Sequence, residues 1–227
     1  MRYAIPAPPV TTIPVLGGDP FPVRRIYCVG RNYAAHAREM GHDPDREPPF
    51  FFMKPADAIV PTGATIPYPP QTKDLHHEIE MVVALQGGGR DIPLDKALDT
   101  VFGYAVGLDL TRRDLQGQAK QMGRPWDMGK GFDRSAPCGP ITPAAKAGHI
   151  AKGAIWLKVN GAVRQKGDID QLIWSVPETI AYLSGLVELA PGDLIYSGTP
   201  EGVAAVGKGD RLEGHVDGLT DLAITIA

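Results

Sequence analysis

Residues 74–85 read Asp-Leu-His-His-Glu-Ile-Glu-Met-Val-Val-Ala-Leu, and this stretch combines a strand-like pattern with the most informative pair of acids in the chain. It predicts one strand from Leu75 to Leu85. Because successive side chains of a strand point to opposite faces, Glu78 and Glu80 are expected to share one face. Carboxylates about 7 Å apart on one face repel each other unless something neutralises them. A solvated strand face is the ordinary explanation of such a pair, and a bound cation is the alternative.

The composition of the whole chain predicts a fold made of many short strands and turns. The 227 residues include 27 glycines and 22 prolines, yet 43% of the chain is apolar. So many helix breakers exclude a helical bundle, and so much apolar material excludes a disordered chain. The Asn160-Gly161 pair also predicts a tight hairpin, since both residues tolerate positive φ. We therefore expect a mainly β fold with a few short helices, of the α+β type.

The pattern along the chain predicts one main domain preceded by a short segment. Residues 1–24 are proline-rich with alternating apolar positions, which is typical of an edge strand or hairpin, and residues 25–227 hold the other expected elements. Asn32 is expected to cap a helix over residues 33–40, and Thr111 to cap the polar helix that follows it.

The net charge and the cysteine content narrow the classes of binding partner and the cellular compartment that we expect. Lys and Arg total 23 against 26 Asp and Glu, giving a net charge of -3 and no basic surface for nucleic acid or anionic lipid. No run approaches the roughly 20 apolar residues of a membrane span, and the N-terminus lacks the apolar core of a signal peptide. Cys28 and Cys138 fit free thiols in a reducing compartment. We expect a cytoplasmic protein that acts on a small molecule.

A third acid makes the pair of glutamates a candidate metal site. Asp109 ends an otherwise uncharged strand, where an unpaired carboxylate would be costly. Alone it would suit a helix cap, but with Glu78 and Glu80 it completes an all-oxygen set of three carboxylates. Such a set suits a hard divalent ion, Mg²⁺ or Mn²⁺. His76 and His77 would favour a softer metal, although His77 is expected on the apolar face of the strand.

Three further motifs carry weaker signals when taken alone. His36 and Glu39 are spaced i, i+3 on an expected helix, where a carboxylate can orient a histidine as a proton acceptor, although an exposed helix face is the commoner explanation. Lys130 lies among glycines and aromatic residues, which suits a surface turn or an active-site cation. The loop Gly198–Gly202 suits a mere turn, or one whose backbone N–H groups bind a carboxylate.

Several separated motifs together resemble the fumarylacetoacetate hydrolase family. They are Gly30-Arg31-Asn32-Tyr33, Lys54-Pro55, Glu78-Ile79-Glu80, Asp109 and Ser197-Gly198-Thr199-Pro200-Glu201-Gly202-Val203. The resemblance runs from about Arg25 to the C-terminus. It is greatest toward bacterial fumarylpyruvate hydrolases, relatives of the acylpyruvate hydrolases and oxaloacetate decarboxylases. It implies a mixed β-sandwich roll like the C-terminal domain of that family, formed by residues 25–227.

The resemblance also implies roles for individual residues. The implied ligands of Mg²⁺ or Mn²⁺ are Glu78, Glu80 and Asp109, and the implied substrate-binding residues are Arg31, Lys54, Gln116 and Thr199. His36 and Glu39 would activate water from a lid helix, with residues 41–49 as its hinge. Lys130 would be a catalytic cation that stabilises negative charge developing on the substrate oxygen.

The activity implied by the resemblance is metal-dependent hydrolysis of a carbon–carbon bond in a 2,4-dioxo acid, an acylpyruvate. Fumarylpyruvate is the favoured substrate; it would yield fumarate and pyruvate in aromatic (gentisate) degradation by a homodimeric enzyme. Its second carboxylate needs a cation, which the sequence leaves open among Arg31, Arg113 and Arg124.

Two other interpretations stay open at this point. The same metal site would also serve an oxaloacetate decarboxylase or an isomerase of unsaturated oxo-diacids. A non-catalytic β-rich binding protein is disfavoured because every candidate catalytic and metal-binding residue is present.

Overall fold

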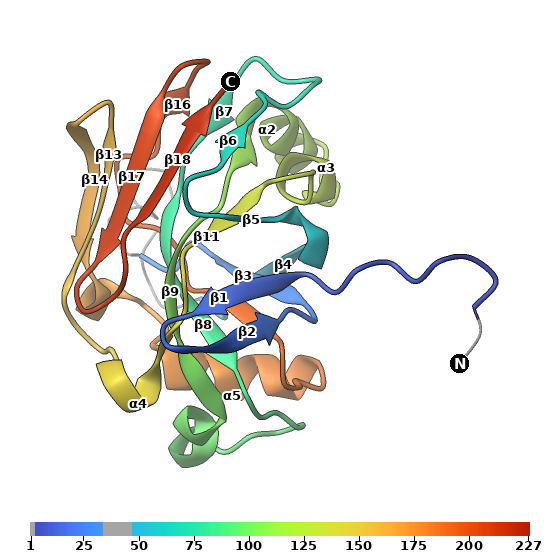
Figure 1. Ribbon diagram of the computed structural model, residues 1–227, viewed down its shortest axis with the longest axis vertical. Coiled ribbons are helices and arrows are strands. Elements are labelled where there is room, and N and C mark those ends of the chain that lie inside the picture. Colours follow the sequence, from blue (N-terminus) through green and yellow to red (C-terminus); the bar gives the residue numbers. More distant parts are fainter. Residues whose placement is uncertain (1–2, 34–46) are drawn as a thin grey trace.

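The structure, a computed structural model, describes residues 3–33 and 47–227 and shows a mainly β protein built on one large mixed sheet (Figure 1). The strands of this sheet follow the order β4-β3-β15-β8-β9-β11-β5, and β12 pairs with β9 outside that path. Their bounds are β3 Ile26–Gly30, β4 Phe50–Lys54, β5 Ile59–Pro61, β8 Ile79–Leu85, β9 Val101–Leu108, β11 Ala136–Cys138, β12 Thr142–Pro143 and β15 Leu194–Tyr196. The prediction of a mainly β fold with short helices is confirmed.

Both faces of the large sheet are buried, and β8 at its centre shows this most clearly. Every residue of β8 is buried. Ile79 and Met81 point into one hydrophobic core, and Val82 and Ala84 point into a second core on the opposite face. Burial on both faces explains why this strand reads as a nearly continuous apolar run. A solvated strand face is therefore the wrong explanation for Glu80.

The expected single strand from Leu75 to Leu85 is interrupted at residues 77–78. Leu75–His76 form β7, which belongs to a separate three-stranded sheet with β10 (Thr111–Arg112) and β16 (Ala205–Val206). The chain changes partners at the interruption: the His77 N–H bonds the Ala204 carbonyl at 3.2 Å, and pairing with β9 begins at Ile79. Alternation alone carried no sign of this change of sheet.

A five-stranded sheet covers the first core, in the order β14-β13-β17-β18-β6. Its bounds are β6 Thr65–Ile66, β13 Ala154–Val159, β14 Ala162–Asp168, β17 Arg211–Val216 and β18 Leu222–Ile226. Strands β13 and β14 are joined by the predicted tight turn, in which Asn160 and Gly161 have φ of 53° and 80°. The Asn-Gly hairpin prediction is confirmed.

An N-terminal hairpin packs on the other face of the large sheet. It consists of β1 (Thr12–Val15) and β2 (Gly18–Pro22), joined at residues 16–17. Ile13 and Phe21 are buried in the second core, and the Leu16 N–H donates to the Ile141 carbonyl at 2.9 Å. The expected hairpin within residues 1–24 is thus present.

Short helices lie at the ends and edges of the sheets. They are α2 Arg113–Gln121, α3 Asp127–Lys130, α4 Ala144–Ala147 and α5 Val176–Leu186, with 3-10 turns η1 Ala56–Ala58, η2 Leu94–Thr100 and η3 Ile169–Gln171. Helix α5 begins with a capping box between Ser175 and Glu178. Within the described part of the chain, no helix has the length and apolar character needed to cross a membrane.

Thr111 does not cap the helix that follows it. Thr111 belongs to β10, and Arg112 holds the N-cap position of α2 without a side-chain capping bond. The Thr111 hydroxyl instead lies 3.3 Å from the Glu78 carboxylate. The prediction was wrong because threonine has the right cap chemistry, but a buried acid lies within its reach. The helix expected over residues 33–40 falls almost wholly outside the described residues.

Candidate active site

Three carboxylates meet where β8 and β9 lie side by side. Glu80 lies within β8, Glu78 precedes it, and Asp109 follows β9. The Asp109 N–H donates to the Glu78 carbonyl at 2.9 Å, which joins the two strand ends. Oxygen atoms from the three carboxylates all lie within 4.8 Å of one another, and all three residues are buried. The structure thus brings the two glutamates together with Asp109, as a shared metal site would require.

Three cations lie against these acids. Lys130 Nζ lies 2.8 Å from Glu78 Oε2 and 2.6 Å from Asp109 Oδ2. Lys54 Nζ lies 2.8 Å from Asp109 Oδ1, and the Arg113 guanidinium pairs with Glu78 Oε1. Glu78 and Asp109 are therefore each held against positive charges, which is the condition under which buried acids stay ionised.

The surroundings of Glu80 disfavour the charged form of its carboxylate. Burial raises its pKa, and the nearby charges of Asp109 and Glu78 raise it further, opposed by a 2.8 Å hydrogen bond from the Gly198 N–H. Burial lowers the pKa of Lys130, but Asp109 and Glu78 outweigh it, so that the pKa is raised overall. Lys130 therefore stays charged, and an added cation beside Glu80 would relieve the repulsion.

Close packing of two helices brings Lys130 to the acids. Helix α3 ends at Lys130 and packs on α2 through Gly129. A Cβ at Gly129 would come 2.8 Å from the backbone nitrogen of Gln116. Only glycine permits this approach. The Lys130 carbonyl in turn accepts a hydrogen bond from Lys54 Nζ, so the two lysines are held against opposite sides of Asp109.

The glycine-rich loop after β15 binds a carboxylate, although it is the protein's own. Gly198 donates its N–H to Glu80, with φ of +101°, and a Cβ there would lie 2.7 Å from the Cβ of Asn32. Asn32 donates from its side-chain amide to the carbonyls of Ser197 and Trp174, at 2.8 and 2.9 Å. Asn32, expected as a helix cap, therefore fixes this loop beside the acids.

Gln165 is a buried residue of the site that the sequence pattern did not reveal. Its Oε1 accepts from the Ile79 N–H at 3.1 Å and lies 2.8 Å from His77 Nδ1. Its Nε2 donates to Thr199 Oγ1 and to the Pro200 carbonyl, both at 2.8 Å. Gln165 thus links residues 77–79, where the strand is interrupted, to the loop after β15 that carries Thr199 and Pro200.

The local signal for Gln165 is faint. It is the one buried residue of β14, which is otherwise exposed or half-buried. The pairing of β13 with β14 shifts register beside Gln165, and such a bulge turns one side chain inward. Because the neighbouring residues of this strand are also polar, the sequence does not indicate that the Gln165 side chain points into the protein.

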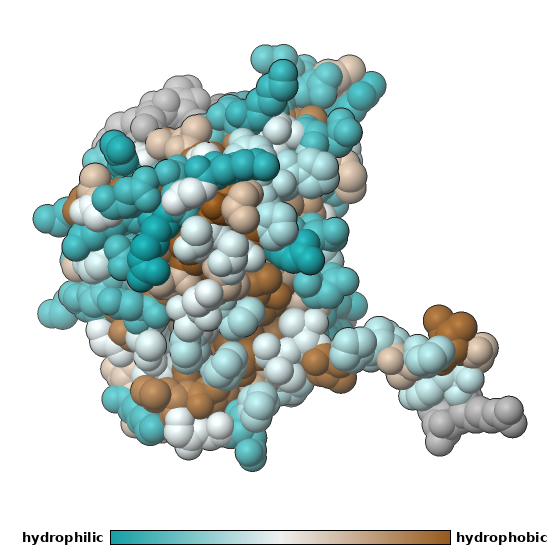
Figure 2. All heavy atoms as spheres, turned by 45° about the horizontal axis from the view of Figure 1, so that its top comes forward, coloured by the Kyte–Doolittle hydropathy of each residue, from teal (hydrophilic) through white to brown (hydrophobic). Residues whose placement is uncertain are grey.

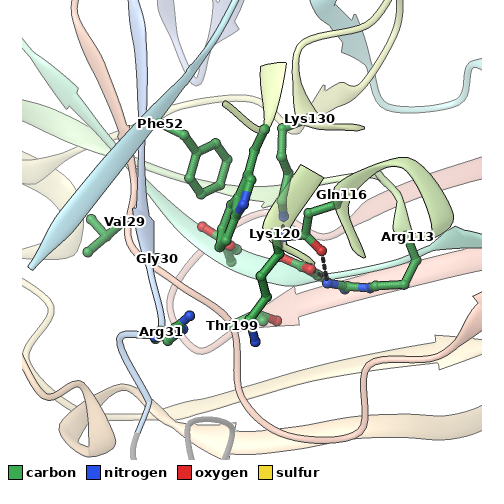
Figure 3. A pocket seen from close by; sticks show the side chains of 12 residues that line it. Val29, Gly30, Arg31, Phe52, Arg113, Gln116, Lys120, Lys130 and Thr199 are labelled. Atoms are coloured by element: carbon green, nitrogen blue, oxygen red, sulfur yellow. Dashed lines mark hydrogen bonds and ion pairs between the residues drawn. The ribbon is translucent and has the colours of Figure 1, made fainter. Parts of the chain in front are cut away.

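A pocket opens above the carboxylates (Figure 3). Its lining comes from β3, α2, α3 and the loop after β15, and includes Arg31, Glu78, Glu80, Arg113, Gln116, Lys120, Lys130 and Thr199. Gln116 Oε1 accepts from Arg113 at 2.6 Å. Lys54 lies behind Asp109 and does not line the pocket. His36 and Glu39 lie outside the described residues.

The three candidate arginines occupy different places. Arg113 is engaged with Glu78 at the pocket. Arg31 borders the pocket and also an adjoining groove, which Arg124 lines as well. Arg31 and Arg124 are thus the arginines placed toward the outer end of the site.

The donor set fits a hard divalent ion. The three residues that can hold one offer carboxylate oxygens alone, they are buried, and their oxygens are close enough to share one ion. The softer-metal alternative loses support, because His76 lies 2.9 Å from Asp74 and His77 lies 2.8 Å from Gln165. Burial lowers the pKa of both histidines, so they pack as neutral rings.

Known proteins resemble this chain over nearly its whole length. Residues 25–227 match the family described as "Fumarylacetoacetate (FAA) hydrolase C-terminal". Fumarylpyruvate hydrolase of Ralstonia sp is 45% identical over 189 residues, which cover 82% of this chain and 98% of the relative. The mitochondrial oxaloacetate tautomerase FAHD1 of Homo sapiens is 41% identical over 203 residues, covering 89% and 91%.

A solved structure resembles the fold equally closely. The crystal structure of fumarylpyruvate hydrolase from Pseudomonas aeruginosa, in complex with Mn²⁺ and pyruvate, superposes with a TM-score of 0.97 at 57% identity. The superposition covers 100% of this chain and 99% of that one. The β-sandwich roll expected from the sequence motifs is thereby confirmed.

Proposed function

The chain belongs to the fumarylacetoacetate (FAA) hydrolase family, and from that premise we propose that it hydrolyses the carbon–carbon bond of an acylpyruvate, with fumarylpyruvate as substrate. The observation that carries the proposal is the buried cluster of Glu78, Glu80 and Asp109 beneath a pocket that also holds Lys130. The 57% identical fumarylpyruvate hydrolase with Mn²⁺ and pyruvate supports both the substrate and the metal.

Glu78, Glu80 and Asp109 would hold the metal, Mn²⁺ or Mg²⁺. When bound, the ion would supply Lewis-acid polarisation of the 2-oxo acid end of the substrate, a contribution of several kcal/mol. Charge supports this assignment: once Glu80 is ionised as a ligand, the three acids balance the three cations, so a dication and a dianionic substrate add no net charge to the buried site. Fumarylpyruvate, with two carboxylates, is such a dianion.

The other residues at the pocket would orient the substrate, stabilise developing charge and bind the distal carboxylate. Gln116 and Thr199 would orient the oxo-acid end, and the buried Lys130 ammonium would stabilise the negative charge that develops on its oxygen. Lys54, placed behind Asp109, would act on substrate binding by holding that ligand. Arg31 would bind the distal carboxylate, because it borders both the pocket and the groove beyond it.

His36, oriented by Glu39, would take a proton from water. The hydroxide adds to the C4 carbonyl, the C3–C4 bond breaks, and its electron pair passes to pyruvate as an enolate. Protonation of C3 gives pyruvate, while C4 leaves as the carboxylate of fumarate.

A second candidate is tautomerisation of oxaloacetate. The 41% identity to the human oxaloacetate tautomerase favours it. The same pocket would stabilise the enolate formed when a proton leaves C3 of the keto form or the oxygen of the enol form, without adding water or breaking a carbon–carbon bond. We rank it second because the two fumarylpyruvate hydrolases are more similar to this chain, at 45% and 57% identity.

The decisive experiment compares substrates. Purified protein is assayed with Mn²⁺, with Mg²⁺ and after chelation, on fumarylpyruvate, maleylpyruvate and oxaloacetate, with pyruvate, fumarate and CO₂ quantified. We expect stoichiometric pyruvate and fumarate, lost on chelation. Much higher kcat/KM for oxaloacetate would overturn the hydrolase proposal. His36→Ala should retain metal affinity and lose hydrolysis.

Three finer statements belong to the same proposal. We propose that the enzyme is a homodimer, that it acts in the cytoplasm, and that it serves breakdown of aromatic compounds through gentisate. We also propose that residues 25–227 form the catalytic domain and that residues 1–24 are an appended segment, of which the hairpin Thr12–Pro22 packs on that domain.

A further inference from the structure

The first described residues form an arm that stands clear of the protein body (Figure 2). Residues 3–10, named here the arm, are all exposed, and they precede the first strand of the N-terminal hairpin. Tyr3, Ile5 and Val10 are 62%, 75% and 69% exposed. Large apolar side chains gathered on one projecting segment indicate a binding partner.

The arm is anchored and stiff. At its base the Thr11 carbonyl accepts a hydrogen bond from the Val23 N–H at 2.9 Å, and Ile13 is fully buried, so the direction of exit is fixed. Pro6, Pro8 and Pro9 restrict the backbone to extended conformations that lose little entropy on binding. At about 3.1 Å per residue, residues 6–10 reach roughly 15 Å from the body, before a bend at residues 4–5.

A groove suited to such a segment lies between β4 and α3. It has a volume of about 570 Å³, and its lining is Arg31, Phe50, Phe51, Phe52, Met53, Arg124, Pro125, Trp126 and Asp127. The rings of Phe50 and Trp126 meet edge to face at 5.3 Å. Met53 and the nearby Met128 are 44% and 68% exposed. Aromatic grooves are the usual receptors for proline-rich segments, and exposed methionines adapt to apolar ligands.

We propose that the arm of one copy docks into this groove on a second copy of the chain. In Figure 1 the arm extends toward the side of the molecule that carries α3, β4 and β5, and away from its own body. Two copies that face each other on this side, related by a twofold axis, can exchange arms so that each groove receives the partner's arm.

The exchange would also complete the active site. Arg31, Phe52 and Trp126 line both the groove and the pocket above the three carboxylates. An arm bound in the groove therefore forms the outer wall of the partner's pocket. This inference concerns assembly, so it stands independently of the substrate proposed above.

Cross-linking between differently tagged chains tests the contact. Cys28 and Cys138 are buried, so introduced surface cysteines are the reactive ones. Chains with Ile5→Cys are mixed with chains carrying Met128→Cys and treated with a short thiol cross-linker. We expect a covalent heterodimer carrying both tags. The matched control is Val163→Cys, which is 53% exposed on β14, on the far side of the molecule.

The outcomes separate the possibilities. Equal cross-linking to Val163→Cys, or cross-linking only within one chain when both cysteines are present, would overturn the proposal. A second measurement uses sedimentation velocity: Ile5→Asp with Val10→Asp should raise the dimer dissociation constant about tenfold or more, whereas Leu186→Asp, exposed on α5, should not. An unchanged constant, or a wild-type protein that is monomeric at all concentrations, would also contradict it.

Discussion

Two ionic clusters in this protein have similar nitrogen–oxygen distances, but one is buried and the other is on the surface. In the active site, Lys130 lies 2.8 and 2.6 Å from Glu78 and Asp109, and these side chains are 2%, 7% and 0% exposed. On the five-stranded sheet, His215 lies 3.0 and 2.6 Å from Asp217 and Asp221, with exposures of 25%, 57% and 62%. Distance alone would equate them.

Solvent explains the difference between the buried cluster and the surface cluster. Water screens the surface cluster and solvates any partner left behind, so such pairs contribute little to stability. In the buried cluster each charge depends on the others, because removing one leaves the rest desolvated. The buried cluster is therefore the one whose charges an added metal ion or a charged substrate would affect most.

The largest effect is expected from Lys130→Met. The variant keeps the length of the side chain and removes the charge shared by Glu78 and Asp109, so the metal-free protein should lose about 3–5 kcal/mol of unfolding free energy. Urea denaturation without metal measures this. The control, Lys158→Met on the five-stranded sheet, removes a lysine that lies over the Trp156 ring and should cost about 0.5 kcal/mol or less. Equal losses would mean that burial does not set the cost of removing a lysine charge from this protein.

The next effect concerns metal affinity. Glu80→Gln keeps the shape and hydrogen-bonding capacity of the side chain but removes a proposed ligand. Mn²⁺ affinity, measured by calorimetry, should fall about a hundredfold or more, since losing only a hydrogen-bond partner of a ligand costs roughly 10–100-fold. The metal-free variant should be at least as stable as wild type, because the pKa of Glu80 is raised by burial and by its neighbouring acids. Undiminished affinity would remove Glu80 from the site.

A smaller effect is expected at Gln165, which supports the buried cluster from behind. Gln165→Leu leaves the Ile79 N–H and the Pro200 carbonyl without their partner, and should cost about 1–3 kcal/mol. The kcat/KM for hydrolysis should fall as well, because Thr199 Oγ1 and the Ile79 N–H lose the hydrogen bonds that Gln165 makes to both. Gln171→Leu, which removes one exposed hydrogen bond to the Asp168 N–H, is the matched control. Its stability and kcat/KM should stay close to wild type.

The smallest effect belongs to the surface cluster and depends on pH. Burial lowers the pKa of His215, but hydrogen bonds to Asp221 and Asp217 outweigh it and raise the pKa above 6.5. The resulting stabilisation is complete below the unfolded pKa and is lost as the pH rises through the folded pKa. Titration by NMR should show this raised pKa, and Asp221→Asn should lower it. Asp210→Asn, whose carboxylate bonds Asn160, should leave it unchanged.

Sequence patterns correctly predicted those features that depend on residues close together in the chain. The Asn160-Gly161 turn needs positive φ at both residues, so the sequence identifies it directly. Strand alternation predicted that Glu78 and Glu80 share one face, and the two carboxylates do lie together, although Glu78 precedes β8 at the interruption of the strand. Thr111 shows the opposite case: its hydroxyl suits a helix cap, yet it lies against Glu78, a contact decided by the pairing of β10 with β7.

The sequence by itself determined the β class, the three acids and the glycines that let the chain turn beside them. It did so because turn geometry and side-chain alternation depend on neighbours along the chain. Only the tertiary structure decided that both faces of β8 are buried, that Lys54 lies behind Asp109, and that Gln165 points inward. These facts follow from pairing and packing between segments far apart in the chain, and the low polarity that this packing creates makes the cluster reactive.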